Sequence, residues 1–422
     1  MKVRVRPSKV AGNISIPSSK SMAHRALICA SLAQGESFLY GITPSKDIEA
    51  TIACMTSLGA EITEEKEGYR IKGTDLKLEG QTPVLDCHES GSTLRFLIPI
   101  ASLTHQKIIF KGQGRLMERP MDVYSDLFWK QGLFFKQDQE KIEIQGSIQA
   151  GKILLAGDVS SQFISGLLFA LPLLKKDSTL EIVPPYESRS YVDLTIQMLK
   201  KFGIVIHTLD EYHYHIPGSQ SYQAGNVQVE GDYSQMAFFG VLAAIQGKLS
   251  LFNMDPISLQ GDKEILSFLK KAGALVSVHN DRVDVVKNHL KAQEIDLSNC
   301  PDLGPILCVL ASYCLGTTHF WHAGRLRIKE SDRVEAMETE LKKWGVPISS
   351  TFDSITITGK KSYEKSPITI NGHNDHRIVM AMTVFGLCAQ AESIIEDAQA
   401  ITKSYPTFFE DVLSIGGKVE IL

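Results

Sequence analysis

Basic and hydroxyl side chains stand at several positions where helices are expected to begin. In PSSKSMAHRAL, Lys20, Ser21 and Arg25 lie at and just inside the start of an apolar helical segment. A cation at this end opposes the helix dipole, so its presence indicates a bound anion that offsets the repulsion. The alternative is a solvated lysine beside a capping serine, and this segment alone leaves both interpretations open.

Neutral hydrogen-bond donors open a second segment of the same kind. GDVSSQF places Ser160, Ser161 and Gln162 at an expected helix start, an arrangement suited to a phosphate group. Ser188, in PYESRSYVD, begins the following surface helix and would serve the same anion. Plain helix capping would also explain these serines.

An arginine occupies a third helix start. HESGSTLRF presents the backbone amide of Gly91 with Arg95 one turn later. In GRLMERPMD, Pro120 suits the first position of a helix, which would place Arg119 at the cap. Since a cap is normally Ser, Thr, Asp or Asn, Arg119 is unfavourable there for stability and indicates a function.

The segment LRIKESDRVEAM carries the densest set of charges. It packs Lys329, Glu330, Asp332 and Arg333 into five residues ahead of a helix. Asp332 with Glu335 matches a capping pair, which assigns Asp332 a structural role. Lys329, Glu330 and Arg333 are then left for a ligand.

Charged residues also enter segments that are otherwise apolar, which stability alone seldom explains. GHNDHRIVM sets Asp375, His376 and Arg377 against a buried helix. NCPDLGPIL puts Asp302 at the same point of another segment, where capping is again the alternative, and KSYPTFF supplies Lys403.

Several common site patterns are missing from the sequence. It has no GxxxxGK[ST], no GxGxxG after a strand, no HExxH, no GxSxG elbow and no CxxC pair. Nucleotide binding through such loops, serine-hydrolase chemistry and a paired-cysteine metal site are therefore unsupported.

A sequence repeat of helix, glycine and strand positions these residues. It returns six times at a spacing of roughly 70 residues, which indicates internal duplication. The helices close at Gly59, Gly132, Gly203, Gly273, Gly345 and Gly416/Gly417.

Each repeat is expected to hold a strand, a buried helix, a strand, a surface helix and a strand or hairpin. Segments that are apolar nearly all round should form the buried helices: 19–35, 90–103, 160–174, 233–247, 302–316 and 375–387. Segments with one polar face should lie outside: 191–203, 261–273 and 331–345. Alternating runs read as strands: 3–7, 68–73, 141–146, 354–359 and 418–422.

The bulk composition fits a globular protein of two or three domains, since 422 residues are too many for one core. A net charge of -4 gives no reason to expect nucleic acid or an acidic membrane as partner. The seven cysteines lie mostly in apolar runs and are expected to be reduced and buried. The N-terminus MKVRVRPSKV has no apolar signal region and no run reaches membrane-span length, so we expect a cytoplasmic protein.

At these residues the chain closely resembles the 5-enolpyruvylshikimate-3-phosphate synthase family of enolpyruvyl transferases. The motifs PSSKSMAHRAL, ESGSTLRF, GRLMERPMD, GDVSSQF, VEGDYSQ, LRIKESDR, NDHR and KSYP occur in family order over essentially the whole length. The resemblance implies transfer of an enolpyruvyl group from phosphoenolpyruvate to the 5-hydroxyl of shikimate 3-phosphate, without metal or cofactor. It also implies a monomer that binds neither nucleic acid nor membrane, and that the herbicide glyphosate targets.

The implied fold is a two-domain inside-out α/β barrel of six βαβαββ repeats, three per domain. Residues 1–18 with 229–422 would form a discontinuous lower domain and residues 19–228 an upper one. The active site would lie in the cleft between them.

The resemblance assigns roles residue by residue. Expected at shikimate 3-phosphate are Lys20, Ser21, Arg25, Ser160, Ser161, Gln162, Ser188, Tyr191, Asp302, Arg325 and Lys329. Expected at phosphoenolpyruvate are Lys20, Gly91, Arg119, Gln162, Arg333, His376, Arg377 and Lys403. Proton transfer would fall to Lys20, Asp302 and Glu330.

Three positions depart from the usual family pattern. Glu89 stands where many members have Asn, Phe96 follows Arg95 where Pro is frequent, and Arg325 replaces a common Asn. These changes put affinity and inhibitor sensitivity in question rather than the reaction.

Two other classes of protein share features with this sequence. The UDP-N-acetylglucosamine enolpyruvyl transferases share the implied fold and donor, but they carry a Cys in the loop that reads GQGRLMERP here. A sliding-clamp-like ring also uses sixfold repeats, yet it needs basic residues along helix faces, and here they crowd the helix starts.

Overall fold

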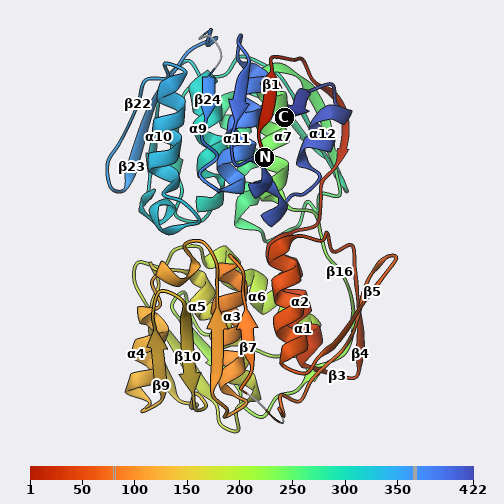
Figure 1. Cartoon of the computed structure of the whole chain (residues 1–422), viewed down its shortest axis with the longest axis vertical. Helices are drawn as coiled ribbons and strands as arrows, with labels where there is room; N and C mark the ends of the chain where they lie inside the picture. Colours follow the sequence, from red (N-terminus) through yellow and green to blue (C-terminus); the bar gives the residue numbers. More distant parts are fainter. Residues whose placement is uncertain (79, 81, 365–367) are drawn as a thin grey trace. The chain divides into compact units, whose positions relative to one another are not determined.

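The computed structural model describes residues 1–78, 80, 82–364 and 368–422, which form two compact units (Figure 1). Unit 1 comprises Met1–Pro17 and Glu230–Leu422, and unit 2 comprises Ser18–Val229. Each unit has its own hydrophobic core of buried residues.

Four-stranded sheets of one pattern build unit 2. In each sheet the first two strands pair in parallel and the remaining pairs are antiparallel. In sheet order they are β16 (Asn226–Gln228), β4 (Glu36–Tyr40), β6 (Gly68–Lys72) and β5 (Glu61–Glu65); β7 (Val84–Asp86), β8 (Ile108–Lys111), β10 (Lys141–Gln145) and β9 (Phe134–Gln137); and β11 (Lys152–Ala156), β12 (Ser178–Val183), β14 (His213–Ile216) and β13 (His207–Thr208). A short parallel pair joins β3 (Ala33–Gln34) to β15 (Tyr222–Gln223).

Unit 1 repeats the same sheet pattern. Its sheets are β2 (Ala11–Ser15), β17 (Lys248–Phe252), β19 (Arg282–Val286) and β18 (Leu275–Val278); β20 (Glu294–Asp296), β21 (Gly316–Trp321), β23 (Ser354–Gly359) and β22 (Ile348–Ser350); and β24 (Ile368–Ile370), β25 (Ser393–Ile395), β1 (Val3–Arg6) and β26 (Lys418–Ile421).

Helices of two kinds pack on these sheets. Those of the first kind are buried on nearly every side: α1 (Lys20–Leu32), α3 (Gly91–Ser102), α5 (Ser161–Ala170), α7 (Tyr233–Gln246), α9 (Gly304–Tyr313) and α11 (His376–Cys388). Those of the second kind keep an exposed face: α2 (Lys46–Ser57), α4 (Asp122–Lys130), α6 (Arg189–Lys201), α8 (Ile265–Ala272), α10 (Arg333–Lys343) and α12 (Phe408–Ser414). The buried and surface helices predicted from the sequence are confirmed, as are the five predicted strands.

The recurring glycines have a backbone reason. Gly59, Gly132, Gly203, Gly273, Gly345 and Gly416 all have φ between +70° and +106°. In this region a side chain is unfavourable, and each glycine ends a surface helix before the next strand. The glycine repeat is therefore a series of identical helix ends.

The chain passes between the units twice, and each time the last strand before the crossing stays in the sheet of the unit that the chain is leaving. β2 precedes α1 of unit 2 in sequence, yet pairs with β17 of unit 1. β16 precedes α7 of unit 1, yet pairs with β4 of unit 2. β1 likewise completes the sheet of β25 and β26 near the C-terminus. Unit 1 thus needs both ends of the sequence.

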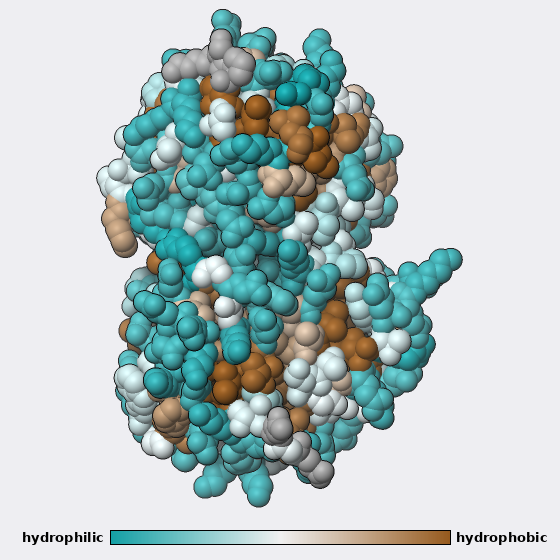
Figure 2. Space-filling view, viewed as in Figure 1, coloured by the Kyte–Doolittle hydropathy of each residue, from teal (hydrophilic) through white to brown (hydrophobic). Residues whose placement is uncertain are grey.

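The surface is ordinary for a globular fold. On the face that Figure 2 shows, hydrophilic residues cover most of each unit and apolar ones surface as separate patches. In the described residues, no helix combines the length and apolar character that a membrane span requires. All seven cysteines are buried and free, as predicted.

Candidate active site

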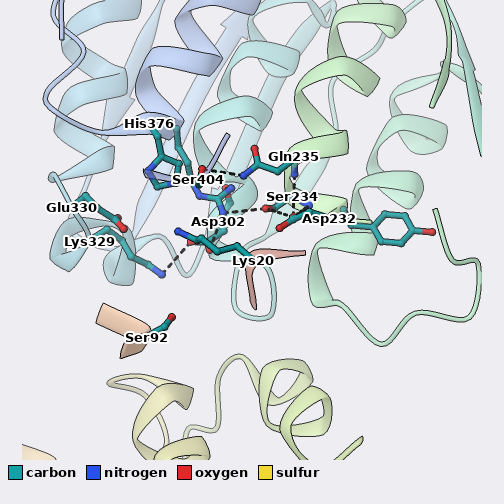
Figure 3. A network of polar contacts seen from close by, with 12 residues as sticks. Lys20, Ser92, Asp232, Ser234, Gln235, Asp302, Lys329, Glu330, His376 and Ser404 are labelled. Atoms are coloured by element: carbon teal, nitrogen blue, oxygen red, sulfur yellow. Dashed lines mark hydrogen bonds and ion pairs between the residues drawn. The ribbon is translucent and has the colours of Figure 1, made fainter. Parts of the chain in front are cut away.

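Asp302 gathers three cations at one carboxylate in unit 1. Its Oδ1 accepts hydrogen bonds from Lys329 Nζ at 3.2 Å and from Arg333 Nη1 at 3.1 Å, and its Oδ2 accepts one from Arg377 Nη2 at 3.1 Å. Arg377 Nη1 also donates to the Asp302 carbonyl at 3.0 Å. Figure 3 shows Lys329 directed at Asp302 within this network. The starts of α9, α10 and α11 therefore meet at Asp302.

Arg333 is buried among acids. Its side chain is 1% exposed, and Nε donates to Asp375 Oδ2 at 2.8 Å while Nη2 donates to Glu330 Oε2 at 2.7 Å. Ser331 Oγ also donates to Asp375, at 3.0 Å. A planar guanidinium with several fixed partners is held in one orientation, ready for a planar anion.

The charges of the cluster fix its protonation. Partial burial alone would raise the pKa of Asp302, but Arg377, Lys329 and Arg333 outweigh burial and hold that pKa well below 3.8. Burial lowers the pKa of Lys329, and Asp302 opposes part of this change. The Asp302 carboxylate is thus ionised at neutral pH, and it partly neutralises cations that an anionic ligand would otherwise meet.

The start of α7 joins the same network. Arg377 Nη2 donates to Ser234 Oγ at 3.1 Å, and Ser234 Oγ donates to the capping carboxylate of Asp232 at 2.6 Å. Gln235 Nε2 donates to Ser404 Oγ at 3.1 Å (Figure 3). Sequence reasoning did not single out these α7 residues.

Two further predicted residues lie on neighbouring segments of unit 1. His376 is buried as the first residue of α11, whose cap is Asp375. Lys403 is 6% exposed at the end of a short 3₁₀ helix, Ala398–Lys403, and its Nζ donates to the Asn374 carbonyl at 2.5 Å. Arg325 lies in the 3₁₀ helix Gly324–Ile328, close enough to Lys329 for its charge to lower the pKa of that lysine.

The helix caps show which acids are structural. Asp332 caps α10 and accepts from Glu335 N at 2.9 Å, which confirms its predicted capping role. Asp302 lies in the 3₁₀ turn Pro301–Leu303, and no side chain caps α9. Its carboxylate is used for cations rather than for capping, so the capping alternative for Asp302 is wrong.

In unit 2, Lys20 opens α1 with an acid as its partner. Lys20 Nζ lies 2.6 Å from Asp47 Oδ2, and both side chains are mostly buried. Ser19 is the cap of this helix and Ser21 follows Lys20. The lysine is thus held by a neighbouring helix rather than extended into solvent.

Arg25 ties α1 to α6. Its Nε donates to Thr195 Oγ1 at 2.8 Å, Nη1 to the Ser21 carbonyl at 2.7 Å and Nη2 to the Tyr191 carbonyl at 2.9 Å. Burial lowers the pKa of Arg25 to about 10, so it stays charged at neutral pH. The guanidinium fixes the backbone of Ser21 and Tyr191.

Three polar side chains converge on Gly91, the first residue of α3. A methyl group added there would lie 2.7 Å from Arg119 Nη1, 3.1 Å from Arg95 Nη1 and 3.7 Å from Gln162 Oε1. Arg95 Nη1 donates to Gln162 Oε1 at 2.8 Å. Because any side chain would displace these groups, the space above Gly91 is suited to a small anion.

Two helix starts of unit 2 present serines. Ser160 caps α5, with Ser161 and Gln162 as its first residues, and Gln162 Nε2 donates to Ser92 Oγ at 2.9 Å. Ser188 precedes α6 with φ of +53° and is 1% exposed. The structure thus brings the starts of α3 and α5 together through Gln162.

One predicted helix start is wrong. α4 begins at Asp122 behind Met121, so Arg119 is not its cap. Arg119 instead follows the 3₁₀ turn Leu116–Glu118 in an extended conformation, because the residue before a proline avoids helical geometry. Its side chain reaches Gly91 all the same.

Phe96 has a structural explanation. It is fully buried, the Arg25 guanidinium lies 5.1 Å from its ring centroid, and it packs edge-on against Phe169. An aromatic ring here supports a buried cation. Glu89 lies beside Gly114, where an added methyl would be 2.7 Å from its Oε2.

A separate cavity of about 940 Å³ lies in unit 2 at the opposite ends of the buried helices. Leu32, Leu103 and Leu173, at or just past the ends of α1, α3 and α5, line it. The predicted site residues do not line this cavity. Among the residues described, no group of His, Cys, Asp and Glu could hold a metal ion.

Comparison with known proteins identifies the family of this chain. Residues 5–412 match the family model of EPSP synthase (3-phosphoshikimate 1-carboxyvinyltransferase). A 3-phosphoshikimate 1-carboxyvinyltransferase from Clostridium perfringens is 42% identical over 99% of this chain and 98% of its own, and one from Clostridium acetobutylicum has the same identity and coverage.

Solved structures show the same fold. An EPSP synthase from Acinetobacter baumannii superposes with a TM-score of 0.82 at 26% identity, covering 99% of both chains. The enolpyruvyl transferase NikO from Streptomyces tendae has a TM-score of 0.81 at 13% identity, covering 99% of this chain and 98% of its own, and shares the fold alone. The α/β fold class predicted from the sequence is confirmed.

The family match defines the class of this protein, a carboxyvinyltransferase. Within that class, the chain belongs to the EPSP synthase (3-phosphoshikimate 1-carboxyvinyltransferase) family. The predicted family and the predicted enzyme class, a carboxyvinyltransferase, are confirmed. The matches do not favour the UDP-N-acetylglucosamine enolpyruvyl transferases or a clamp-like ring.

Proposed function

We propose that this chain transfers the enolpyruvyl group of phosphoenolpyruvate to the 5-hydroxyl of shikimate 3-phosphate and releases inorganic phosphate. The observation that supports this most is Asp302, an ionised carboxylate held by Lys329, Arg333 and Arg377. The reaction needs an acid–base group and anion-binding cations at one place, and this cluster supplies both.

Phosphoenolpyruvate carries a carboxylate and a phosphate, and each would bind to cationic side chains. Arg333 and Arg377 are suited to its carboxylate, because each guanidinium is fixed by acids and offers paired donors. Its phosphate would meet Lys20, Arg119 and Lys403. Gly91, Gln162 and His376 would line the remaining contacts.

Shikimate 3-phosphate would bind mainly at helix starts that carry hydroxyl groups. Ser160, Ser161 and Ser188 would hold its phosphate with backbone amides and hydroxyls. The remaining contacts would come from Lys20, Ser21, Arg25, Gln162, Tyr191, Asp302, Arg325 and Lys329. For Arg25 the role would be to hold Ser21 and Tyr191, since it binds both carbonyls.

The chemistry would proceed by addition and elimination. The methylene carbon of phosphoenolpyruvate takes a proton while the 5-hydroxyl loses one and attacks the adjacent carbon. The tetrahedral intermediate then loses a methyl proton and expels phosphate, which forms the carbon–carbon double bond of the enolpyruvyl ether. We assign the hydroxyl proton to Asp302 and the methylene proton to Glu330 and Lys20.

Substrate charge would tune Asp302 for this step. With Arg377, Lys329 and Arg333 around the carboxylate, the pKa of Asp302 is held too low for an efficient base. When the carboxylate of phosphoenolpyruvate neutralises Arg333 and Arg377, the pKa of Asp302 should rise toward its usual range. The base would thus become stronger once the donor substrate is bound.

The test is a phosphate-release assay with both substrates, and ³¹P NMR identifies the product. We expect phosphate and one enolpyruvyl product only when both substrates are present, and no turnover when UDP-N-acetylglucosamine replaces shikimate 3-phosphate. Release with the nucleotide sugar, or none with shikimate 3-phosphate, would contradict the proposal. A monomeric state and activity without metal remain predictions for the same preparation. Light scattering checks the first, and activity after chelation checks the second. The cytoplasmic location remains a separate prediction.

A further inference from the structure

Four buried side chains of unit 2 form a hydrogen-bonded chain that connects α1, α2 and α3. His24 Nδ1 lies 2.7 Å from Thr51 Oγ1, Thr51 Oγ1 lies 2.7 Å from Thr93 Oγ1, and Thr93 Oγ1 donates to Ser90 Oγ at 2.7 Å. Each of the four residues is at most 1% exposed. The predicted site residues do not include any of them.

The directions of the donors follow from the last bond of the chain. Thr93 gives its hydroxyl proton to Ser90, so it must accept a proton from Thr51. The Thr51 proton goes to Thr93 at 2.7 Å in preference to the Asp47 carbonyl at 3.5 Å, so Thr51 accepts from His24 Nδ1. His24 therefore carries its proton on Nδ1, and its bare Nε2 has no hydrogen-bond partner among the residues that the structure describes.

The neutral form of His24 is enforced by its surroundings. Burial, with smaller effects of Lys20 and Arg25, holds the pKa of His24 well below 6.5. These two cations come from α1, and the group that α2 places against Nδ1 of the ring is the neutral hydroxyl of Thr51. The donor at Nδ1 is thus fixed throughout the neutral pH range.

The far end of the chain sets the first turn of α3. Ser90 Oγ caps this helix by accepting from Thr93 N at 3.2 Å. The next residue is Gly91, against which Arg119, Arg95 and Gln162 converge. A shift of Ser90 would move the amide of Gly91 relative to these three side chains.

We propose that His24 is a positioning residue for the anion-binding start of α3 and acts through Thr51 and Thr93. The inference depends on the proposed function, in which Gly91 and Arg119 bind the phosphate of phosphoenolpyruvate. His24 itself touches no substrate. Its Nδ1 donor orders the hydroxyls that hold the helix cap.

The test compares steady-state kinetics of Thr51→Val, His24→Leu and His24→Asn. Valine and leucine keep bulk but break the chain, whereas the asparagine amide offers a donor near the position of Nδ1. We expect KM for phosphoenolpyruvate to rise about three- to tenfold in the first two variants, as for one lost hydrogen bond. We expect kcat and KM for shikimate 3-phosphate to change less than about twofold, and His24→Asn to restore the parent KM.

Thr383→Val is the matched control. Thr383 is fully buried in α11, and its hydroxyl only donates to the Val379 carbonyl of its own helix, at 2.8 Å. This variant should lose stability without a change in KM, as thermal unfolding and the same assay will show. If Thr51→Val does not fold, His24→Leu and His24→Asn carry the comparison.

Three results would overturn the inference. These are an unchanged KM in the chain-breaking variants, equal losses in His24→Leu and His24→Asn, and a loss confined to kcat. A parent protein that does not turn over the two substrates would instead contradict the proposed function, so the two failures are distinguishable.

Discussion

At the scale of single residues, the cations of unit 1 are already paired with acids. Arg333 contacts Asp302, Glu330 and Asp375. Such pairs hold the arginines in place, but an incoming anion must compete with them. Asp302 contacts Lys329, Arg333 and Arg377. Its removal should therefore slow the chemical step without weakening the binding of phosphoenolpyruvate.

We predict that Asp302→Ala will reduce kcat by about 10²- to 10⁴-fold, because a positioned acid–base group contributes this much. KM for phosphoenolpyruvate should stay the same or fall, since Arg333 and Arg377 lose a competing carboxylate. Phosphate release at saturating substrate measures both. Asp210→Ala is the control, because Asp210 is exposed and its carboxylate contacts Tyr212 and His213, which lie within three residues of it. Equal turnover in Asp302→Ala and parent would remove Asp302 from the mechanism.

A second prediction concerns the space above Gly91. Gly91→Ala places a methyl 2.7 Å from Arg119 Nη1 and 3.1 Å from Arg95 Nη1, so both guanidinium groups must move. We expect KM for phosphoenolpyruvate to rise about 10- to 100-fold, the range for a misplacement near 1 Å. Gly225→Ala is the control, since its methyl would meet nothing nearer than 4.0 Å. Similar kinetics for both variants would show that the anion binds elsewhere.

A third prediction follows from the low pKa of His24. Burial, Lys20 and Arg25 keep the folded state from binding a proton that the unfolded chain binds below about pH 6.5. The contribution of His24 to stability is complete above that pH and is lost as the pH falls. Urea unfolding should show the parent losing about 1 kcal/mol more than His24→Asn between pH 6.5 and 5.5. Parallel losses in the two proteins would contradict the buried, neutral histidine.

Sequence reasoning located most charged residues of the candidate site because their positions violate helix-dipole and capping preferences. It did not single out Asp47, which contacts Lys20 from another helix, or Asp232, which accepts from Ser234 in the same segment. Nothing local in the sequence distinguishes these acids from ordinary caps or surface carboxylates. The contact of Asp47 with Lys20, and that of Ser234 with Arg377, become apparent only when different helix starts are brought together.

At the scale of elements, the period of apolar residues predicted the buried helices, and alternation predicted the strands. Helix limits were less certain, as Arg119 shows, because the extended residue before Pro120 delays α4 to Asp122. The glycines that end the surface helices were the most informative signal. All six occupy a conformation that other residues rarely adopt.

These glycines give a fourth prediction. Gly132 has φ of +70° and open space around it, so Gly132→Ala should cost only backbone strain, about 1 kcal/mol of unfolding free energy. Gly273 has φ of +106°, and a methyl there would lie 2.5 Å from the His289 carbonyl oxygen. Gly273→Ala should therefore cost at least about 2 kcal/mol. Chemical denaturation checks both, and equal costs would contradict the close approach at Gly273.

At the scale of the whole molecule, the two units differ in how they are built from the sequence: unit 2 is one continuous stretch, and unit 1 combines two. Every strand of unit 2 pairs within Ser18–Val229. Unit 1 needs β1 and β2 from the N-terminus to complete two of its sheets. The alternation of apolar residues could not predict these strand pairings, because a strand has the same pattern whichever strand it pairs with.

A fifth prediction follows for fragments of the chain. The segment Ser18–Val229 should fold alone, with cooperative thermal unfolding and dispersed NMR signals, because its core and sheets are self-contained. Glu230–Leu422 should not fold, because edges of two sheets would be exposed. Adding a peptide of residues 1–17 should restore some structure to it. A folded Glu230–Leu422 fragment would contradict the proposed dependence on β1 and β2.

The most direct test of the account is a crystal structure with shikimate 3-phosphate and phosphoenolpyruvate bound to the inactive Asp302→Ala variant. We predict the carboxylate of phosphoenolpyruvate on Arg333 and Arg377, its phosphate near Gly91, Arg119 and Lys403, and the shikimate phosphate on Ser160, Ser161 and Ser188. Ligands bound away from these helix starts, for example in the cavity beside Leu32 and Leu103, would contradict it.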